Sequence, residues 1–311
     1  MSARAALPFA LFLLVVAPLT AAAGPWSLAP GDFFAELRGG VGNGDSYHDW
    51  EGERQTLFRG GEHEERALAS YVEMGWTKRF SIVLGMPVQS VTRRFATDPL
   101  RPTTTGFGDG LFGLKYNLAN GNTAMALQLD WRPPLGYQRD LGLTAADSLD
   151  CGDADGDGDS LDTNCARQVG NARLGEGVQD VTLALHVGTT FGSGFFQAAG
   201  GYRYRFEDPD DQIAVTGDAG WWFGRSLLLA GNYVGDFASA NPERVTDKVS
   251  SQRVGPRIVY RVDPNLDVFA GSLHTLMANN ALHLDSYYVG IAFRETSLNR
   301  LQGFLGGAPS P

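Results

Sequence analysis

Segments of roughly ten residues in which apolar and polar side chains alternate recur along most of this chain. Within the segment 124–132, Met125, Leu127, Leu129 and Trp131 share one face, and polar side chains occupy the other. The same pattern is found in the segments 111–118, 180–187, 196–206 and 287–294. An alternation with a period of two is typical of a β-strand that has one apolar and one polar face. We therefore expect an all-β fold.

Strand length and aromatic position favour a membrane barrel over a soluble β-sandwich. The segments match the ~9–11 residues that cross a bilayer at a tilt. Aromatic side chains gather at segment ends, as in the interfacial girdle of a membrane barrel. The expected girdle comprises Trp76, Phe80, Phe95, Tyr116, Trp131, Phe191, Phe206, Trp221, Trp222, Tyr260 and Phe293. Glycine makes up 40 of the 311 residues, which disfavours a helical protein.

Short and long connections alternate between the segments. The short ones lie near Thr77–Phe80, Asn117–Asn122, Phe191–Gly194, Phe223–Ser226 and Arg261–Leu266. The longer ones span about 42–65, 96–104, 134–175, 207–211, 238–247 and 277–283. This alternation predicts a transmembrane antiparallel up-and-down β-barrel of about twelve strands, with periplasmic turns and outward loops. Such a barrel belongs in the outer membrane of a Gram-negative bacterium, where outer-membrane lipid surrounds it.

The two ends of the chain are expected to lie outside the barrel proper, which we place at residues 24–294. Residues 1–23 carry Arg4, an apolar run and three closing alanines, which is typical of a cleaved signal peptide. The apolar run is shorter than the ~20 residues that a spanning helix needs, which disfavours a membrane anchor. The alternating segment 287–294 resembles the terminal signal read by the barrel-assembly machinery, although a polar tail, 295–311, follows it.

Two motifs carry a family resemblance. Thr105–Tyr116 reads TGFGDGLFGLKY, and Ser81–Pro87 reads SIVLGMP after a short turn. These motifs resemble an outer-membrane family named for transport in the phenol-degradation (MetA) pathway, with specific matches within residues 75–117. The resemblance implies a barrel and the passage of small hydrophobic or aromatic compounds.

An acidic motif in the loop 134–175 predicts a calcium site. Asp153, Asp155 and Asp157 occupy positions 1, 3 and 5 of a D-x-D-x-D-G loop, in which Asp159 would supply its backbone carbonyl. Asp162 stands one place beyond the usual ninth position. The motif resembles the Ca²⁺ loops of EF-hands and thrombospondin type 3 repeats, but no glutamate closes it. The alternative is a solvated acidic loop without an ion.

The two cysteines of the chain, Cys151 and Cys165, bracket this acidic motif. Export places them in an oxidising compartment, where such a pair forms a disulfide. A Cys151–Cys165 bond would close the outer loop around the expected calcium site.

Charged residues on the polar faces of the strands are expected to line the barrel lumen. Ten are cationic and six anionic, so the lumen is predicted to be net positive. They are Glu36, Arg38, Glu73, Arg93, Asp109, Lys115, Asp130, Arg132, Asp180, Arg203, Arg205, Asp218, Arg253, Arg257, Arg261 and Arg294. The predicted solute path comprises Arg38, Arg93, Arg132, Arg203, Arg205, Arg253, Arg257 and Arg261. Arginines can guide anions through a pore, or pair with carboxylates and simply rigidify a narrow barrel.

These features predict a porin-like outer-membrane channel or transporter for small solutes, either hydrophobic and aromatic or anionic. The alternative is a structural or adhesion barrel that presents the calcium loop to a partner. A net charge of −10 argues against nucleic-acid binding. We expect no enzymatic activity. A barrel phospholipase would need serine and histidine together on the lipid-facing wall, and the nearest pairing, Ser272 with His274, has a spacing that is common by chance.

Overall fold

The computed structural model describes residues 24–26, 28–57, 60–94, 103–135, 178–206, 211–239 and 249–295. Within these residues the chain forms one closed antiparallel barrel of twelve long strands. The predicted fold class and strand number are confirmed. The predicted signal peptide, the acidic motif with its cysteines and the tail beyond Glu295 lie outside the described residues and stay predictions.

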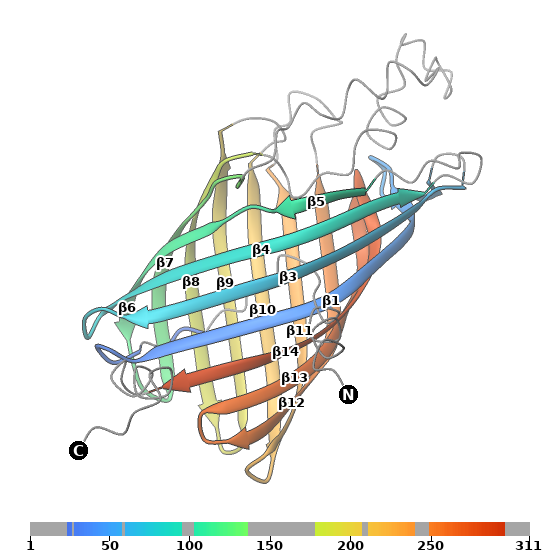
Figure 1. Ribbon diagram of the computed structural model, residues 1–311. Helices are drawn as coiled ribbons and strands as arrows, with labels where there is room; N and C mark the ends of the chain where they lie inside the picture. The colour runs from blue at the N-terminus through green and yellow to red at the C-terminus, as the bar shows by residue number, and fades with distance from the viewer. Residues whose placement is uncertain are drawn as a thin grey trace, which may run out of the picture.

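The wall strands follow one another around the barrel in chain order (Figure 1). They are β1 (Phe33–His48), β3 (Glu62–Gly75), β4 (Phe80–Arg94), β6 (Leu111–Ala119), β7 (Thr123–Arg132), β8 (Asp180–Phe191), β9 (Gly194–Arg205), β10 (Gln212–Phe223), β11 (Leu227–Ala238), β12 (Ser250–Asp263), β13 (Leu266–Asn279) and β14 (Ala281–Glu295). Pairing of β14 with β1, in which Phe33 lies opposite Glu295, closes the barrel. Two short strands, β2 (Arg54–Thr56) and β5 (Thr103–Phe107), pair with the outer parts of β1 and β4.

The connections confirm one part of the predicted pattern and correct another. All five predicted short turns are present, and Gly192 and Gly224 adopt positive φ angles of 58° and 67° in two of them. Glycine adopts this backbone region without steric penalty, which explains its place there. The connection expected at 277–283 is not a longer loop. Strands β13 and β14 extend to a tight turn at Asn280, whose φ is 48°.

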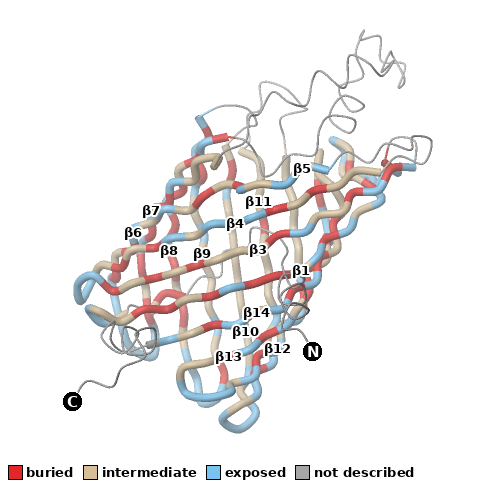
Figure 2. The backbone as a smooth tube through the Cα atoms, in the orientation of Figure 1, coloured by how far each residue is buried: buried red, intermediate tan, exposed pale blue. Residues whose placement is uncertain are grey.

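Burial alternates along the wall strands as the sequence predicts (Figure 2). In β6, the outward Phe112 and Leu114 are 42% and 41% exposed, while the inward Lys115 is 1% exposed. Apolar side chains therefore cover the outside of the barrel and polar ones face its interior. Among the described residues, no helix has both the length and the apolar character needed to cross a membrane.

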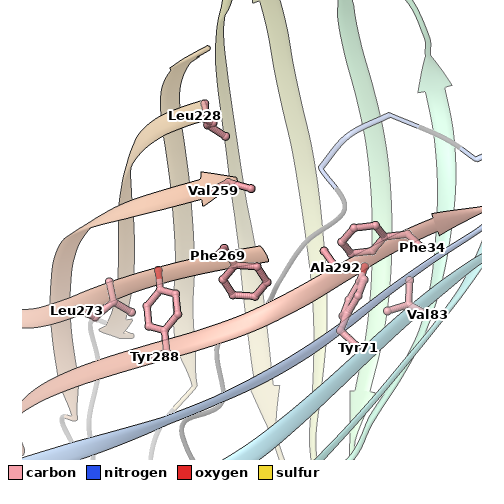
Figure 3. Packing of buried hydrophobic residues seen from close by; sticks show 9 residues of the cluster. All are labelled: Phe34, Tyr71, Val83, Leu228, Val259, Phe269, Leu273, Tyr288 and Ala292. Atoms are coloured by element: carbon pink, nitrogen blue, oxygen red, sulfur yellow. The ribbon is translucent and has the colours of Figure 1, made fainter. Parts of the chain in front are cut away.

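Apolar side chains also fill part of the barrel interior. They project inward from several strands (Figure 3), and the cluster comprises Phe34, Tyr71, Val83, Leu228, Val259, Phe269, Leu273, Tyr288 and Ala292. Phe34 meets Tyr71 edge to face at 6.1 Å between ring centroids, and Phe269 meets Tyr288 in the same way at 6.2 Å. Such edge-to-face pairs are a favourable aromatic geometry. The interior is thus a partly packed lumen and not a wide polar pore.

Candidate functional site

The described residues enclose two cavities inside the barrel. The outer cavity, of about 220 Å³, is lined by residues toward the long-loop end, including Arg132, Asp180 and Arg203. The inner cavity, of about 410 Å³, is lined by residues toward the short-turn end, including Trp222 and Arg261. Glu36 of β1 lines both cavities, so they meet at the level of this side chain. We therefore take the two cavities together as the candidate site.

Buried ion pairs and hydrogen bonds hold Arg203, which lines the outer cavity, and the nearby Arg205. A guanidinium nitrogen of Arg203 lies 3.2 Å from Asp236, and another lies 4.0 Å from Asp180. Arg203 and Arg205 each donate a hydrogen bond of 2.9 Å to Gln212 Oε1. Both arginines are buried. Their charges are therefore tied to neighbouring strands, and they brace the wall.

Near the junction of the cavities, two arginines lie against aromatic rings. The Arg257 guanidinium is 4.5 Å from the centroid of Phe269, and the Arg38 guanidinium is 5.3 Å from that of Tyr288. Both arginines also approach Glu36, at 3.8 Å and 4.0 Å respectively. A guanidinium over an aromatic face gains a cation–π attraction that holds its plane against the ring.

The short-turn end of the inner cavity repeats this arrangement. Arg261 lies 4.2 Å from the ring of Trp222, and Arg294 lies 5.7 Å from the ring of Phe34. Both arginines pair with Asp267, at 3.1 Å and 2.9 Å. We call the pairs Arg38–Tyr288, Arg257–Phe269, Arg261–Trp222 and Arg294–Phe34 the arginine–aromatic face.

Trp222 is placed differently from the sequence prediction. The sequence predicts both Trp221 and Trp222 in the interfacial aromatic girdle, but Trp222 lines the inner cavity beneath Arg261. Successive side chains in a strand point to opposite faces, so two adjacent tryptophans cannot both face the membrane. Trp221 is the outward one, at 47% exposed. The two-residue period of the strand is therefore the sequence signal that would have identified Trp222 as a lumen residue.

A chain segment before β1 enters the lumen, which sequence reasoning did not predict. Lys115 Nζ donates a 2.9 Å hydrogen bond to the carbonyl of Gly24, and Asn117 Nδ2 donates one of 3.2 Å to that of Pro25. Trp26 donates from its indole to the carbonyl of Gly121 at 3.2 Å and lines the inner cavity. We call Gly24–Trp26 the lumen segment. It narrows the short-turn end of the lumen.

A buried ion pair anchors the lumen segment. Lys115 Nζ lies 2.6 Å from Glu73 Oε2, and the two side chains are 1% and 0% exposed. Tyr71 also donates its hydroxyl to Glu73 at 3.3 Å. A lone inward lysine was visible in the sequence, but its partners lie 42 and 91 residues away. No local pattern could have identified them.

The predicted solute-path arginines are distributed unevenly. Four of them line the outer cavity, namely Arg38, Arg132, Arg203 and Arg253. Arg257 and Arg261 line the inner cavity. Arg205 and Arg93 line neither of these two cavities. Arg205 donates its hydrogen bond to Gln212, and Arg93 lies opposite His63 near the outer end of β4.

Among the described residues, no group of three or more histidine, cysteine, aspartate or glutamate side chains could hold a metal ion. The predicted calcium ligands and the predicted disulfide lie outside the described residues. The structure therefore neither supports nor opposes them.

No protein-family model and no curated protein matches this sequence. Among solved structures, the chain is similar to an outer-membrane channel from Pseudomonas putida F1, with a TM-score of 0.62 at 12% identity over 90% of this chain and 100% of that one. A weaker match is the NanC porin, with a TM-score of 0.47 at 10% identity over 83% of this chain and 98% of that one. Another is the CymD monoaromatic hydrocarbon channel, with a TM-score of 0.41 at 8% identity over 86% of this chain and 89% of that one. The fold is that of an outer-membrane barrel, in agreement with the predicted location. The resemblance to the phenol-degradation family stays a prediction.

Proposed function

We propose that this protein is an outer-membrane channel for small solutes and that its lumen favours small anions, aromatic carboxylates above all. The observation that carries the proposal is the arginine–aromatic face, which runs from the junction of the two cavities to the short-turn end. It offers positive charge and flat apolar surface side by side, and an aromatic carboxylate presents the complementary groups.

The held geometry of these arginines supports recognition of carboxylates. A guanidinium presents its N–H groups in a planar fork that matches a carboxylate, and stacking on a ring orders that plane. Arg257 and Arg261 keep side-chain exposures of 25% and 31% toward the cavity. They are therefore accessible to a solute, in contrast to the buried Arg203.

The resemblance to the phenol-degradation family supports the aromatic part of the same proposal. That family is named for transport in the phenol-degradation pathway, and the resemblance implies the passage of small aromatic compounds. The ring surfaces of Phe269, Trp222 and Phe34 would contact such a solute along its path.

The direct test is conductance and flux of the purified protein in lipid bilayers and liposomes. The expected result is single-channel conductance with a reversal potential that indicates anion preference, and faster uptake of benzoate than of benzyl alcohol or benzylamine. Arg257→Gln should lower the benzoate preference roughly fivefold, because one charge near 4 Å contributes about 1 kcal/mol in a watery lumen.

Arg66→Gln is the matched control, because Arg66 is an exposed arginine of β3 that pairs with Glu64 outside the lumen. It should leave uptake unchanged. Absence of conductance and of solute uptake would contradict the channel and would leave the structural or adhesion barrel as the better reading.

We also propose, from the sequence alone, that the outer loop binds Ca²⁺ through its acidic motif and is closed by a Cys151–Cys165 disulfide. Calorimetric titration with Ca²⁺ should show heat that is lost in Asp155→Ala and Asp157→Ala. A mobility difference between reduced and non-reduced samples would report the disulfide. Equal, negligible heats in all three proteins would end the calcium proposal.

A further inference from the structure

Three polar side chains linked by hydrogen bonds lie on the outward-facing surface of the barrel wall, away from the lumen. His274 Nε2 is 3.0 Å from Ser272 Oγ, and His274 Nδ1 is 3.0 Å from Asp285 Oδ1. Ser272 and His274 are two residues apart on β13, and Asp285 lies directly opposite His274 on the neighbouring strand β14. The pairing of these adjacent strands (Figure 1) brings the three groups together.

These side chains point away from the lumen. On β13 they share a face with Val268 and Leu276, which are 41% and 58% exposed, while the intervening Leu273 is 1% exposed. The side chains of His274 and Asp285 are 40% and 44% exposed. The histidine and the carboxylate are therefore accessible from outside, and Ser272 is more covered, at 8%.

Their level in the membrane follows from the outward side chains of β14. From the short-turn end toward the outer end, these are Phe293, Ile291, Val289, Tyr287, Asp285 and His283. The order runs from apolar residues through a tyrosine to polar residues. Tyrosine is enriched where the hydrocarbon meets water. On β14 the polar side chains therefore begin just beyond Tyr287, while on β13 the exposed Leu276 and Met277 carry apolar surface further toward the outer end. The three polar groups thus lie in the outer part of the apolar band, where an acyl ester of a lipid or an amphiphile can reach them.

The geometry is that of an activated nucleophile. With its proton on Nδ1, His274 donates to Asp285, and Nε2 is then free to accept the proton of the Ser272 hydroxyl. Asp285 holds the ring in this tautomer and would stabilise the imidazolium that forms. We propose that Ser272, His274 and Asp285 form a serine-hydrolase site that acts on acyl esters at the outer surface of the membrane. His274 is the general base, and Asp285 is a positioning residue.

The reaction balances with water as its second substrate. Ser272 Oγ bonds to the ester carbonyl carbon while its proton passes to His274 Nε2. The tetrahedral intermediate then releases the alcohol, which takes that proton, and leaves an acyl-serine. Water attacks the acyl-serine through the same base and releases the carboxylic acid. The net change is ester plus water to acid plus alcohol.

The test uses the full-length protein, purified in detergent, and a fluorophosphonate probe, which phosphonylates a reactive serine and releases fluoride. We expect the label on the peptide that contains Ser272, as identified by mass spectrometry. Ser272→Ala should abolish labelling. His274→Ala should slow it by roughly 10²–10⁴-fold, the usual contribution of a general base. Because the label is mapped on the wild-type protein, the test does not depend on the folding of any variant.

Ser90→Ala is the control variant. Ser90 is a serine of β4 whose hydroxyl accepts a hydrogen bond from Thr105 on β5, so it lies outside the proposed site. This variant should label like the wild type. Asp285→Asn should lower kcat for a chromogenic ester and leave KM unchanged, a split that a purely structural role would not produce. Heat-modifiable gel mobility confirms that each variant is folded.

Two substrate arms distinguish the source of the ester. Fatty-acid release from phospholipid vesicles that contain the protein would identify membrane lipid as the substrate. Hydrolysis of a soluble short-chain ester alone would identify an ester that arrives from the medium. Either result supports the site. No label on Ser272, or a labelling rate that His274→Ala leaves unchanged, would overturn it and support the expectation from sequence that this pairing is incidental.

Discussion

Two sets of charged side chains face the same lumen, and they differ in how completely they are enclosed. Lys115 and Glu73 are fully buried against each other and against the lumen segment. Arg257 and Arg261 are partly exposed and lie on aromatic rings beside open cavity. The first set is sealed from the cavity and stabilises the structure, whereas the second keeps part of its surface open to the cavity.

The comparison shows that the sign of an inward charge does not reveal its role. Both sets look alike in sequence, as charged residues on the polar face of a strand. Their roles separate only through burial, because a desolvated pair depends on its partner while a partly solvated arginine keeps binding capacity. The first three predictions below each test one side of this difference, and the fourth concerns a charge outside the barrel for contrast.

The largest effect is expected at the closed pair. Lys115→Met leaves Glu73 buried without its counter-charge, which should lower the free energy of unfolding by about 3–5 kcal/mol. Urea titration followed by gel mobility measures the change. The double variant Lys115→Met with Glu73→Leu should recover most of the loss, because it removes both charges. A loss under about 1 kcal/mol in the single variant would mean that the pair is solvated, unlike a typical buried pair.

The next effect concerns the lumen segment. A Cβ atom added at Gly188 would lie 2.6 Å from Pro25 Cγ, so Gly188→Ala must displace the segment. We expect a loss of about 1–3 kcal/mol, as for other overpacked sites, and a higher single-channel conductance. Gly200→Ala on the neighbouring strand is the control, because its Cβ would meet nothing within 4 Å. Unchanged conductance in Gly188→Ala would show that the segment does not limit flow.

A smaller effect is expected on the open side. Phe269→Leu removes the ring beneath Arg257 and keeps the charge. Loss of a cation–π contact of about 0.5–1 kcal/mol should lower benzoate uptake roughly two- to fivefold relative to acetate. Liposome uptake of the two anions gives the ratio. An equal decrease for both anions would show that charge alone selects the solute.

The smallest effect is expected outside the barrel, at Asp49 in the β1–β2 connection. Desolvation alone would raise the pKa of Asp49, but hydrogen bonds from Gln55 and from the backbone N–H groups of Glu53 and Glu51 hold that pKa below its ordinary value. The stabilisation is therefore present above the ordinary value and is lost as the pH falls through the lowered pKa. Asp49→Ala should speed hydrogen exchange locally and change global stability by less than about 0.5 kcal/mol.

Particular residues show how far sequence reasoning reached. The short turns were predictable because glycine and breaks in the alternation are local signals, as at Gly192 and Gly224. The inward position of Lys115 and Arg257 was also predictable, because the alternation of apolar and polar side chains is itself a local signal. The tight turn at Asn280 was not, since the strand pattern continues less regularly there. Asp285 was not assigned to His274, because strand register depends on pairing between strands and not on either strand alone.

The class of the molecule can be read from the amino-acid sequence. A period of two specifies strands with one apolar face, and strands of about ten residues with aromatic side chains at their ends specify a membrane barrel. Three features follow from the folded structure alone: which inward charges are sealed and which are open, the entry of residues before the first strand into the lumen, and the meeting of serine, histidine and aspartate on the outward face of the wall. The two kinds of information differ in the distance along the chain over which they act. Alternation acts between neighbours in the chain, whereas burial and register arise from contacts between residues far apart in it.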